Sequence, residues 1–168
     1  MSAPKLIILY DGVCNLCATV VRFVLARDPA RAFSFCAIQS RAAAPLLLAA
    51  RVPPAEALSS FVLLDTATGV ALRRSDAALA IGARLSGAWP WLAAAGRWVP
   101  RPLRDAVYDC VAARRYAWFG KAGEGAEGGG GAGDSCHAPT RAVLSRFVDA
   151  EEVVENLRRR RKGRDTAD

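Results

Sequence analysis

Two cysteines near the N-terminus, Cys14 and Cys17, form a C-x-x-C motif. A short apolar run precedes the motif and apolar residues at helical spacing follow it, so we expect Cys14 at the N-terminus of a helix. Free backbone N–H groups and the helix dipole favour an anion there, which makes a thiolate nucleophile. Cys17 lies three residues later on nearly the same helix face, within reach of a disulfide. The pair predicts exchange in which Cys14 attacks a substrate disulfide and Cys17 then releases the reduced substrate, with no metal or organic cofactor.

A carboxylate, Asp11, precedes Cys14 by three residues at the expected end of a strand. A carboxylate beside a dithiol can accept or return the proton that exchange requires. The alternative is a purely structural role, because Asp-Gly pairs are common in turns. The candidate catalytic residues are therefore Cys14, Cys17 and Asp11.

A C-x-x-C motif can also be half of a zinc site that a second pair of Cys or His completes. The sequence has no second C-x-x-C, and the remaining candidate ligands are Cys36, Cys110, Cys136 and His137. The alternative to an enzyme is thus a thioredoxin-like binding module with a non-catalytic or metal-binding C-x-x-C. We expect Cys36 and Cys110 to be packed thiols. Cys136 is either a third redox cysteine or an exposed thiol.

Hydrophobic periodicity predicts the elements that position the motif. Residues 5–10 form a continuous apolar run typical of a strand buried on both faces, and the following helix must end at Asp28-Pro29. Further strands are expected at residues 32–38, 59–65 and 70–74, and further helices at residues 40–51, 75–85, 89–99 and 103–118. This β-α-β-α-β-β-α order with extra C-terminal helices predicts an α/β, thioredoxin-like fold with a small mixed sheet. Aromatic residues on the last two helices are expected in the core, and Arg114-Arg115 as a solvated or salt-bridged pair.

The composition changes after residue 121, so we expect the thioredoxin-like domain to occupy residues 1–121. Seven of the 14 residues from 122 to 135 are Gly, which predicts a flexible linker. Residues 136–168 contain a C-x-x-P element and a basic segment that is either helical or disordered. We expect this tail to be independent of the domain.

Charge and hydropathy exclude several classes of protein. The net charge is +7 but is spread along the chain, so we do not expect nucleic-acid binding. The longest stretch without a charged residue has 12 residues, whereas a bilayer-spanning helix needs about 20. Five cysteines and no secretory signal predict reduced thiols in the cytoplasm. The expected partners are a disulfide-containing protein or small molecule and a dithiol reductant, and no membrane.

Residues 11–17 resemble the D-x-x-C-x-x-C signature of the DCC family of thiol-disulfide oxidoreductases. The resemblance continues through residues 39–40, 75–77, 97–100, 103–108 and 115–121, and residues 136–139 are similar to an element that closes many family members. It covers most of residues 5–121 and implies thiol-disulfide exchange at Cys14 and Cys17. Thioredoxins themselves carry a cis-proline before the third strand, where residues 59–61 here read Ser-Ser-Phe.

Overall fold

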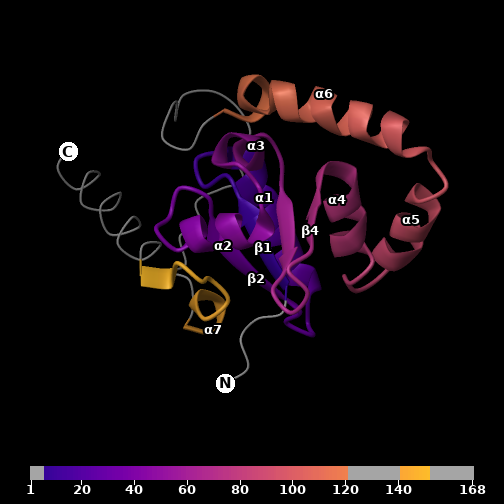
Figure 1. Ribbon diagram of the computed structural model, residues 1–168. Helices are drawn as coiled ribbons and strands as arrows, with labels where there is room; N and C mark the ends of the chain where they lie inside the picture. Colours follow the sequence, from indigo (N-terminus) through magenta and orange to yellow (C-terminus); the bar gives the residue numbers. More distant parts are fainter. Residues whose placement is uncertain (1–5, 121–140, 152–168) are drawn as a thin grey trace, which may run out of the picture.

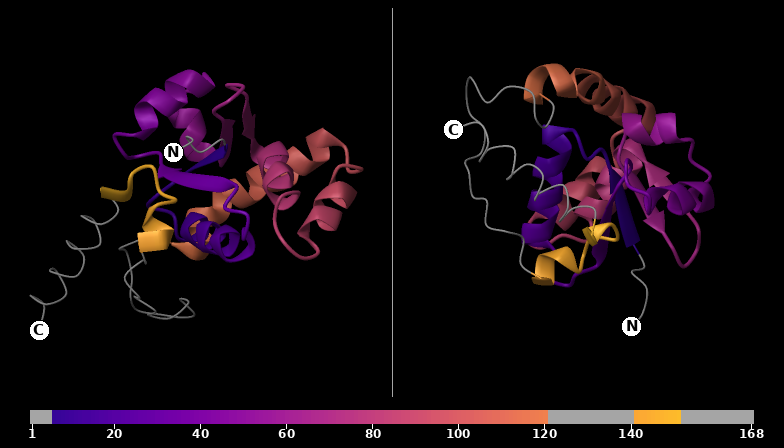
Figure 2. Two further views of the ribbon diagram at one scale, coloured as in Figure 1. Left: turned by 90° about the horizontal axis from the view of Figure 1, so that it is seen from below. Right: turned by 90° about the vertical axis from the view of Figure 1, so that its left-hand side faces the viewer.

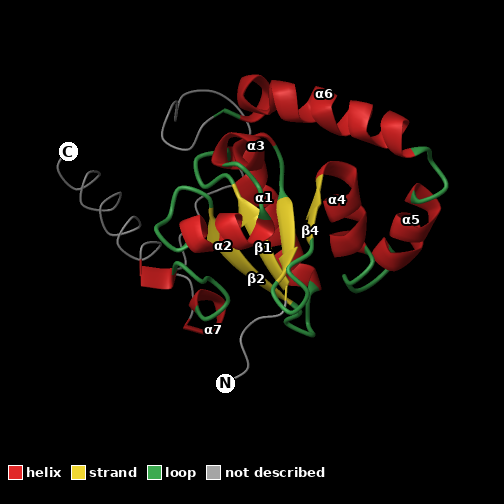
Figure 3. Cartoon of the chain, in the orientation of Figure 1, coloured by secondary structure: helices red, strands yellow, loops and turns green. Residues whose placement is uncertain are grey.

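A four-stranded mixed sheet lies at the centre of the computed structural model, which describes residues 6–120 and 141–151 (Figures 1 and 3). Its strands follow the order β2-β1-β3-β4. Strand β1 pairs in parallel with β2 and antiparallel with β3, and β3 pairs antiparallel with β4. The strands are β1 (Leu6–Tyr10), β2 (Phe33–Ala37), β3 (Val62–Asp65) and β4 (Ala71–Arg73). This arrangement confirms the predicted thioredoxin-like α/β fold.

Helices cover both faces of the sheet, as the side view in Figure 2 shows. The helices are α1 (Asn15–Arg27), α2 (Ala43–Ala50), α3 (Pro54–Ser59), α4 (Arg74–Gly82), α5 (Trp89–Gly96), α6 (Arg101–Phe119) and α7 (Arg141–Leu144). Successive side chains of a strand point to opposite faces, and β1 therefore feeds two cores. Ile8 joins Val21 and Val24 of α1, whereas Leu9 joins Leu47 of α2. Burial on both faces explains why β1 is apolar throughout.

The segment between β2 and β3 differs from the expected single helix. Pro53-Pro54 ends the first helix as expected, but a second short helix, α3, begins there. Pro53 has an extended backbone as N-cap, and Pro54 occupies the first turn, where proline lacks no needed hydrogen bond. Helix α3 places the Leu58 carbonyl below the end of β1, where it contacts the site described below.

Helix α6 runs along one side of the molecule and packs against α1 and α4 (Figure 1). Its single buried residue is Arg115. Apolar side chains nevertheless remain exposed on α5, α6 and the turn between them, and the expectation that the aromatic residues of these helices lie in the core is wrong for most of them. The large exposed aromatic residues are Trp89, Trp91, Trp98, Trp118 and Phe119.

Residues 141–151 dock on the free edge of β2, so the prediction of an independent tail is wrong for this segment. The Phe35 amide donates to the Arg146 carbonyl and the Val148 amide to the Phe35 carbonyl, both at 2.8 Å. Arg146 forms a buried ion pair with Asp28 and also donates to the Phe33 carbonyl. The predicted redox or exposed Cys136, its neighbour His137 and most of the expected basic helix lie outside the described residues.

Among residues 6–120 and 141–151, we find no helix that combines the length and hydropathy needed to cross a bilayer.

Candidate active site

The two motif cysteines lie where β1 passes into α1. Cys14 is the N-cap residue of α1, with an extended backbone, and its carbonyl accepts the first helical hydrogen bond from Ala18 at 3.0 Å. Its amide donates to the Asp11 carbonyl at 3.3 Å, which closes the turn between strand and helix. Cys14 is completely buried and Cys17 is 3% exposed. The predicted location of Cys14 at a helix N-terminus is thus the observed one, and both cysteines are free thiols.

The environment of Cys17 keeps that thiol protonated. Burial raises the pKa of Cys17 to about 12, and a hydrogen bond to Cys14 acts in the same direction. The positive charge of Arg115 and the Asp11 backbone oppose this rise without cancelling it. Cys17 is therefore a thiol at neutral pH and lies within hydrogen-bonding distance of Cys14.

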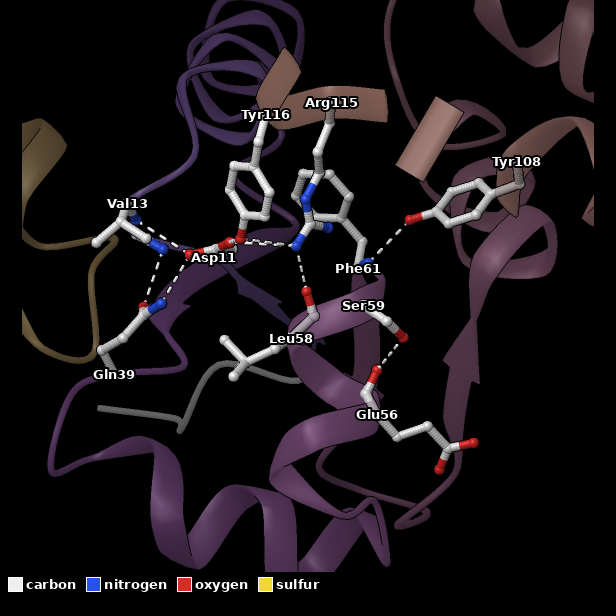
Figure 4. A network of polar contacts seen from close by, with 11 residues as sticks. Asp11, Val13, Gln39, Glu56, Leu58, Ser59, Phe61, Tyr108, Arg115 and Tyr116 are labelled. Carbon is white, nitrogen blue, oxygen red and sulfur yellow. Dashed lines mark hydrogen bonds and ion pairs between the residues drawn. The ribbon is translucent and has the colours of Figure 1, made fainter. Parts of the chain in front are cut away.

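The Asp11 carboxylate is surrounded by hydrogen-bond donors (Figure 4). Its Oδ1 accepts from the Val13 amide at 3.1 Å and from Gln39 Nε2 at 2.7 Å. Its Oδ2 accepts from the Tyr116 hydroxyl and forms an ion pair with Arg115 Nη2 at 3.2 Å. Asp11 is 2% exposed, so four partners replace the water that an ionised carboxylate would otherwise require.

Arg115 connects this carboxylate to α3 and to the dithiol. Its Nη2 donates to the Leu58 carbonyl and, at 3.0 Å, to the Tyr116 hydroxyl. Burial lowers the pKa of Arg115, but the hydrogen bond to the Tyr116 hydroxyl and the negative charges that Tyr116, Cys17 and Cys14 carry when ionised more than offset that effect and raise it. The pKa of Tyr116 is raised by burial and by its hydrogen bond to Asp11, so Tyr116 remains a neutral donor.

A second contact holds the Asp-Gly turn against the end of β2. Gln39 Oε1 accepts from the Gly12 amide at 2.9 Å while its amide nitrogen donates to Asp11. A Cβ atom at Gly12 would lie 3.2 Å from the Ala37 Cβ and from Gln39 Oε1. A side chain at this position would require these neighbours to shift by a few tenths of an ångström, so glycine suits the close approach of the turn to β2.

Sequence reasoning found Cys14, Cys17 and Asp11, and the structure brings the three together. It did not assign a role in the site to Gln39, Arg115 or Tyr116, although all three belong to the segments that resemble the family. The prediction for Arg114-Arg115 holds in both of its forms: Arg114 is exposed and Arg115 is salt-bridged. The sequence signal for these three residues was that their segments, together with the dithiol, resemble short motifs of one family.

Comparison with known proteins adds to this geometry. Residues 8–121 match the family described as DCC1-like thiol-disulfide oxidoreductase. The chain belongs to that family. It is 35% identical over 145 residues to the uncharacterized protein YuxK of Bacillus subtilis, which covers 86% of this chain and 95% of YuxK. It is also 39% identical over 115 residues to a chloroplastic DCC family protein of Arabidopsis thaliana, which covers 68% of this chain and 65% of that protein. No solved structure matches significantly.

The remaining described cysteines of this DCC1-like protein differ from each other. Cys36 is buried in β2, as expected, and contacts Ser40 Oγ at 3.4 Å. Cys110 is exposed, contrary to expectation, because it lies on the outer face of α6, and Arg114 Nη1 donates to its sulfur at 2.5 Å. Neither lies with the dithiol in a group of three or more metal-binding side chains in the described part of the chain.

Proposed function

We propose that this protein is a thiol-disulfide oxidoreductase that works through Cys14 and Cys17. The observation that carries the proposal is the unequal environment of two neighbouring thiols. Cys14 is the N-cap residue of α1, the position at which an attacking cysteine usually lies, whereas Cys17 lies in the first turn and is held as a thiol by burial. This difference suits Cys14 as the attacking cysteine and Cys17 as the resolving cysteine, which must lose its proton once the mixed disulfide has formed.

In the proposed reaction the Cys14 thiolate attacks one sulfur of a substrate disulfide. The substrate S–S bond breaks, one substrate thiolate leaves, and a mixed disulfide with Cys14 remains. Cys17 then loses its proton and attacks the Cys14 sulfur, which releases the second substrate thiol and forms the Cys14–Cys17 disulfide. Two electrons pass from the protein to the substrate, and an external dithiol, oxidised in turn, restores the reduced pair.

Asp11 and Arg115 have complementary roles in this proposal. The proton of Cys17 must leave a buried site, and Asp11 is the carboxylate that the sequence assigns to this task. Four partners surround Asp11, and we propose that Arg115 holds its charge in place and stabilises the thiolate that forms at Cys17. We expect the protein to act in the cytoplasm, with a dithiol reductant there.

A mixed-disulfide trap tests the assignment. In a Cys110→Ser background, which removes the exposed thiol on α6, Cys17→Ser should retain a substrate disulfide covalently on Cys14. Cys14→Ser in the same background is the matched control and should retain none. Equal trapping by the two variants would contradict the division of roles.

Metal analysis separates the proposal from the alternative binding module. Protein purified without oxygen should contain no stoichiometric zinc. One zinc per chain that is lost in Cys14→Ser would replace the redox assignment with a metal site.

A further inference from the structure

A groove of about 780 Å³ lies between α1, α4, α5 and α6, beside the dithiol. Cys17 and Arg115 border it, whereas Cys14 does not. Its other walls are almost entirely apolar, and they include Leu16, Phe61, Leu79, Trp89, Val107 and Val111. The volume falls within the range of about 300–1,000 Å³ that is usual for small-molecule sites.

Most polar groups in the walls already have partners within the protein. Ser75, Arg104 and Tyr108 hydrogen-bond to Asp105, to the Val99 carbonyl and to the Phe61 amide, respectively. Ser75 and Arg104 would lose a contact of the fold by binding a ligand, and Tyr108 offers only its hydroxyl hydrogen, so the groove favours a mainly apolar ligand.

Arg115 also has a donor without a partner in the described part of the chain. Its side chain lines the groove at 7% residue exposure, and its Nε–H has no hydrogen-bond partner among the described residues. A buried donor without a partner costs about 1–3 kcal/mol. The Nε atom has almost no exposed surface, so a ligand oxygen becomes its acceptor only if the Arg115 side chain turns toward the groove on binding. A carbonyl or carboxylate oxygen bound there would lie next to Cys17.

The start of β3 does not favour an extended polypeptide as the ligand. Polypeptides bind sheet proteins largely through main-chain hydrogen bonds. The Phe61 amide, which immediately precedes β3 and borders the groove, donates to the Tyr108 hydroxyl at 2.9 Å. Helix α6 thus occupies the main-chain donor that an incoming strand would use.

We infer that the groove binds the apolar part of a small disulfide substrate whose chain carries a carbonyl or carboxylate oxygen close to the sulfur. The oxygen accepts from Arg115 Nε, the apolar chain follows α6, and the disulfide projects past Cys17 to Cys14, which is hydrogen-bonded to Cys17 and attacks the substrate. This inference rests on the proposed function and names the substrate class of the same dithiol. The bonds that form and break are those of the exchange given above.

Two synthetic disulfides with the same sulfur chemistry test it. N,N′-Dioctanoylcystamine carries an amide carbonyl and an apolar chain, and N,N′-diacetylcystamine carries the carbonyl alone. The reduced full chain with Cys110→Ser is mixed with each, and formation of the Cys14–Cys17 disulfide is followed by peptide mapping. We expect the dioctanoyl compound to react at least tenfold faster, after correction for the rates of both compounds with free glutathione.

A charge placed in the groove should abolish this preference. Val107 is 61% exposed and lies eight residues from Arg115, about 12 Å along α6 at 1.5 Å per residue. In Val107→Arg the ratio of the two rates should fall to within about twofold of unity. Val70→Arg, at a 55% exposed position in the β3–β4 hairpin turn, is the matched control and should keep the full ratio.

Binding without chemistry separates failure of this inference from failure of the proposed function. N-Ethyloctanamide has the amide and the apolar chain of the dioctanoyl compound but no sulfur. Calorimetry should detect its binding to the control variant Val70→Arg but not to Val107→Arg. Equal rates for the two disulfides together with no amide binding would overturn the groove assignment and leave the oxidoreductase intact. Amide binding without reaction of either disulfide would overturn the proposed function, and with it the substrate assignment.

Discussion

Replacing Arg115 by methionine removes the charge that faces Asp11 and keeps much of the aliphatic stem. The two side chains are 8% and 2% exposed, and Nη2 and Oδ2 are 3.2 Å apart. The Leu58 carbonyl loses its contact with the same nitrogen. The substitution therefore leaves a buried carboxylate without its counter-charge rather than deleting a surface ion pair.

The expected cost follows from what remains around Asp11. Breaking a buried pair by removing one partner costs about 3–5 kcal/mol. The Asp11 carboxylate still accepts from Val13, Gln39 and Tyr116 in the variant, which favours the lower end. We expect the free energy of unfolding to fall by about 3 kcal/mol, a large share of the ~5–15 kcal/mol typical of a domain.

Urea unfolding of the reduced protein measures this loss as a lower midpoint at an unchanged m-value. Arg114→Met is the matched control, because Arg114 is the neighbouring residue on α6 and is exposed. We expect that control to change stability by no more than about 0.5 kcal/mol. Adding Asp11→Asn to Arg115→Met should recover part of the loss, since neither charge then remains buried.

Function gives an independent readout of the same substitution. The Arg115 charge lowers the pKa of Cys17 from the still higher value that burial alone would produce. Its removal should raise that pKa further and slow resolution of a mixed disulfide, whereas Arg114→Met should not. If Arg115→Met costs no more stability than Arg114→Met and resolves at the same rate, then the Asp11–Arg115 pair does not have the role argued here.

Three further predictions follow from the buried and exposed groups. The Cys17 pKa of about 12 lies above that of an unfolded thiol, so the stabilisation from this group should be fully present below about pH 8.5. Above that pH the free energy of unfolding of the reduced protein should fall by about 1.4 kcal/mol per pH unit. Urea titrations between about pH 8.5 and 10 should show this slope, and Cys17→Ala should lack it. Arg146→Met should lower the free energy of unfolding by about 3 kcal/mol, because it leaves buried Asp28 without its counter-charge, and an equally large loss in the exposed Arg141→Met would refute that cause. Brief iodoacetamide treatment of the reduced native protein should modify Cys110 before Cys14 or Cys17, since only Cys110 of the three is exposed; peptide mapping that finds either motif cysteine modified first would contradict the burial described here.

The sequence by itself determined the features that depend on neighbouring residues. The apolar run of β1, the Asp-Gly turn and the periodicity of α1 are local signals, and they placed Cys14 as the N-cap of a helix. The order of strands and helices then restricted the sheet to a small set of topologies. Residues 39–40 and 115–121 resemble motifs of the family, but the sequence does not indicate what they contact.

Only the tertiary structure decided which distant side chains meet the dithiol and its carboxylate. Arg115 reaches Asp11 across 104 residues, and Arg146 reaches Asp28 across 118. Hydrophobic periodicity reports which face of an element is buried but not which partner it meets, so it could not foresee that α6 buries an arginine and leaves Cys110 exposed. The docking of residues 141–151 was missed for the same reason: main-chain hydrogen bonds to an open strand edge and one buried ion pair hold that segment, and neither has a local pattern.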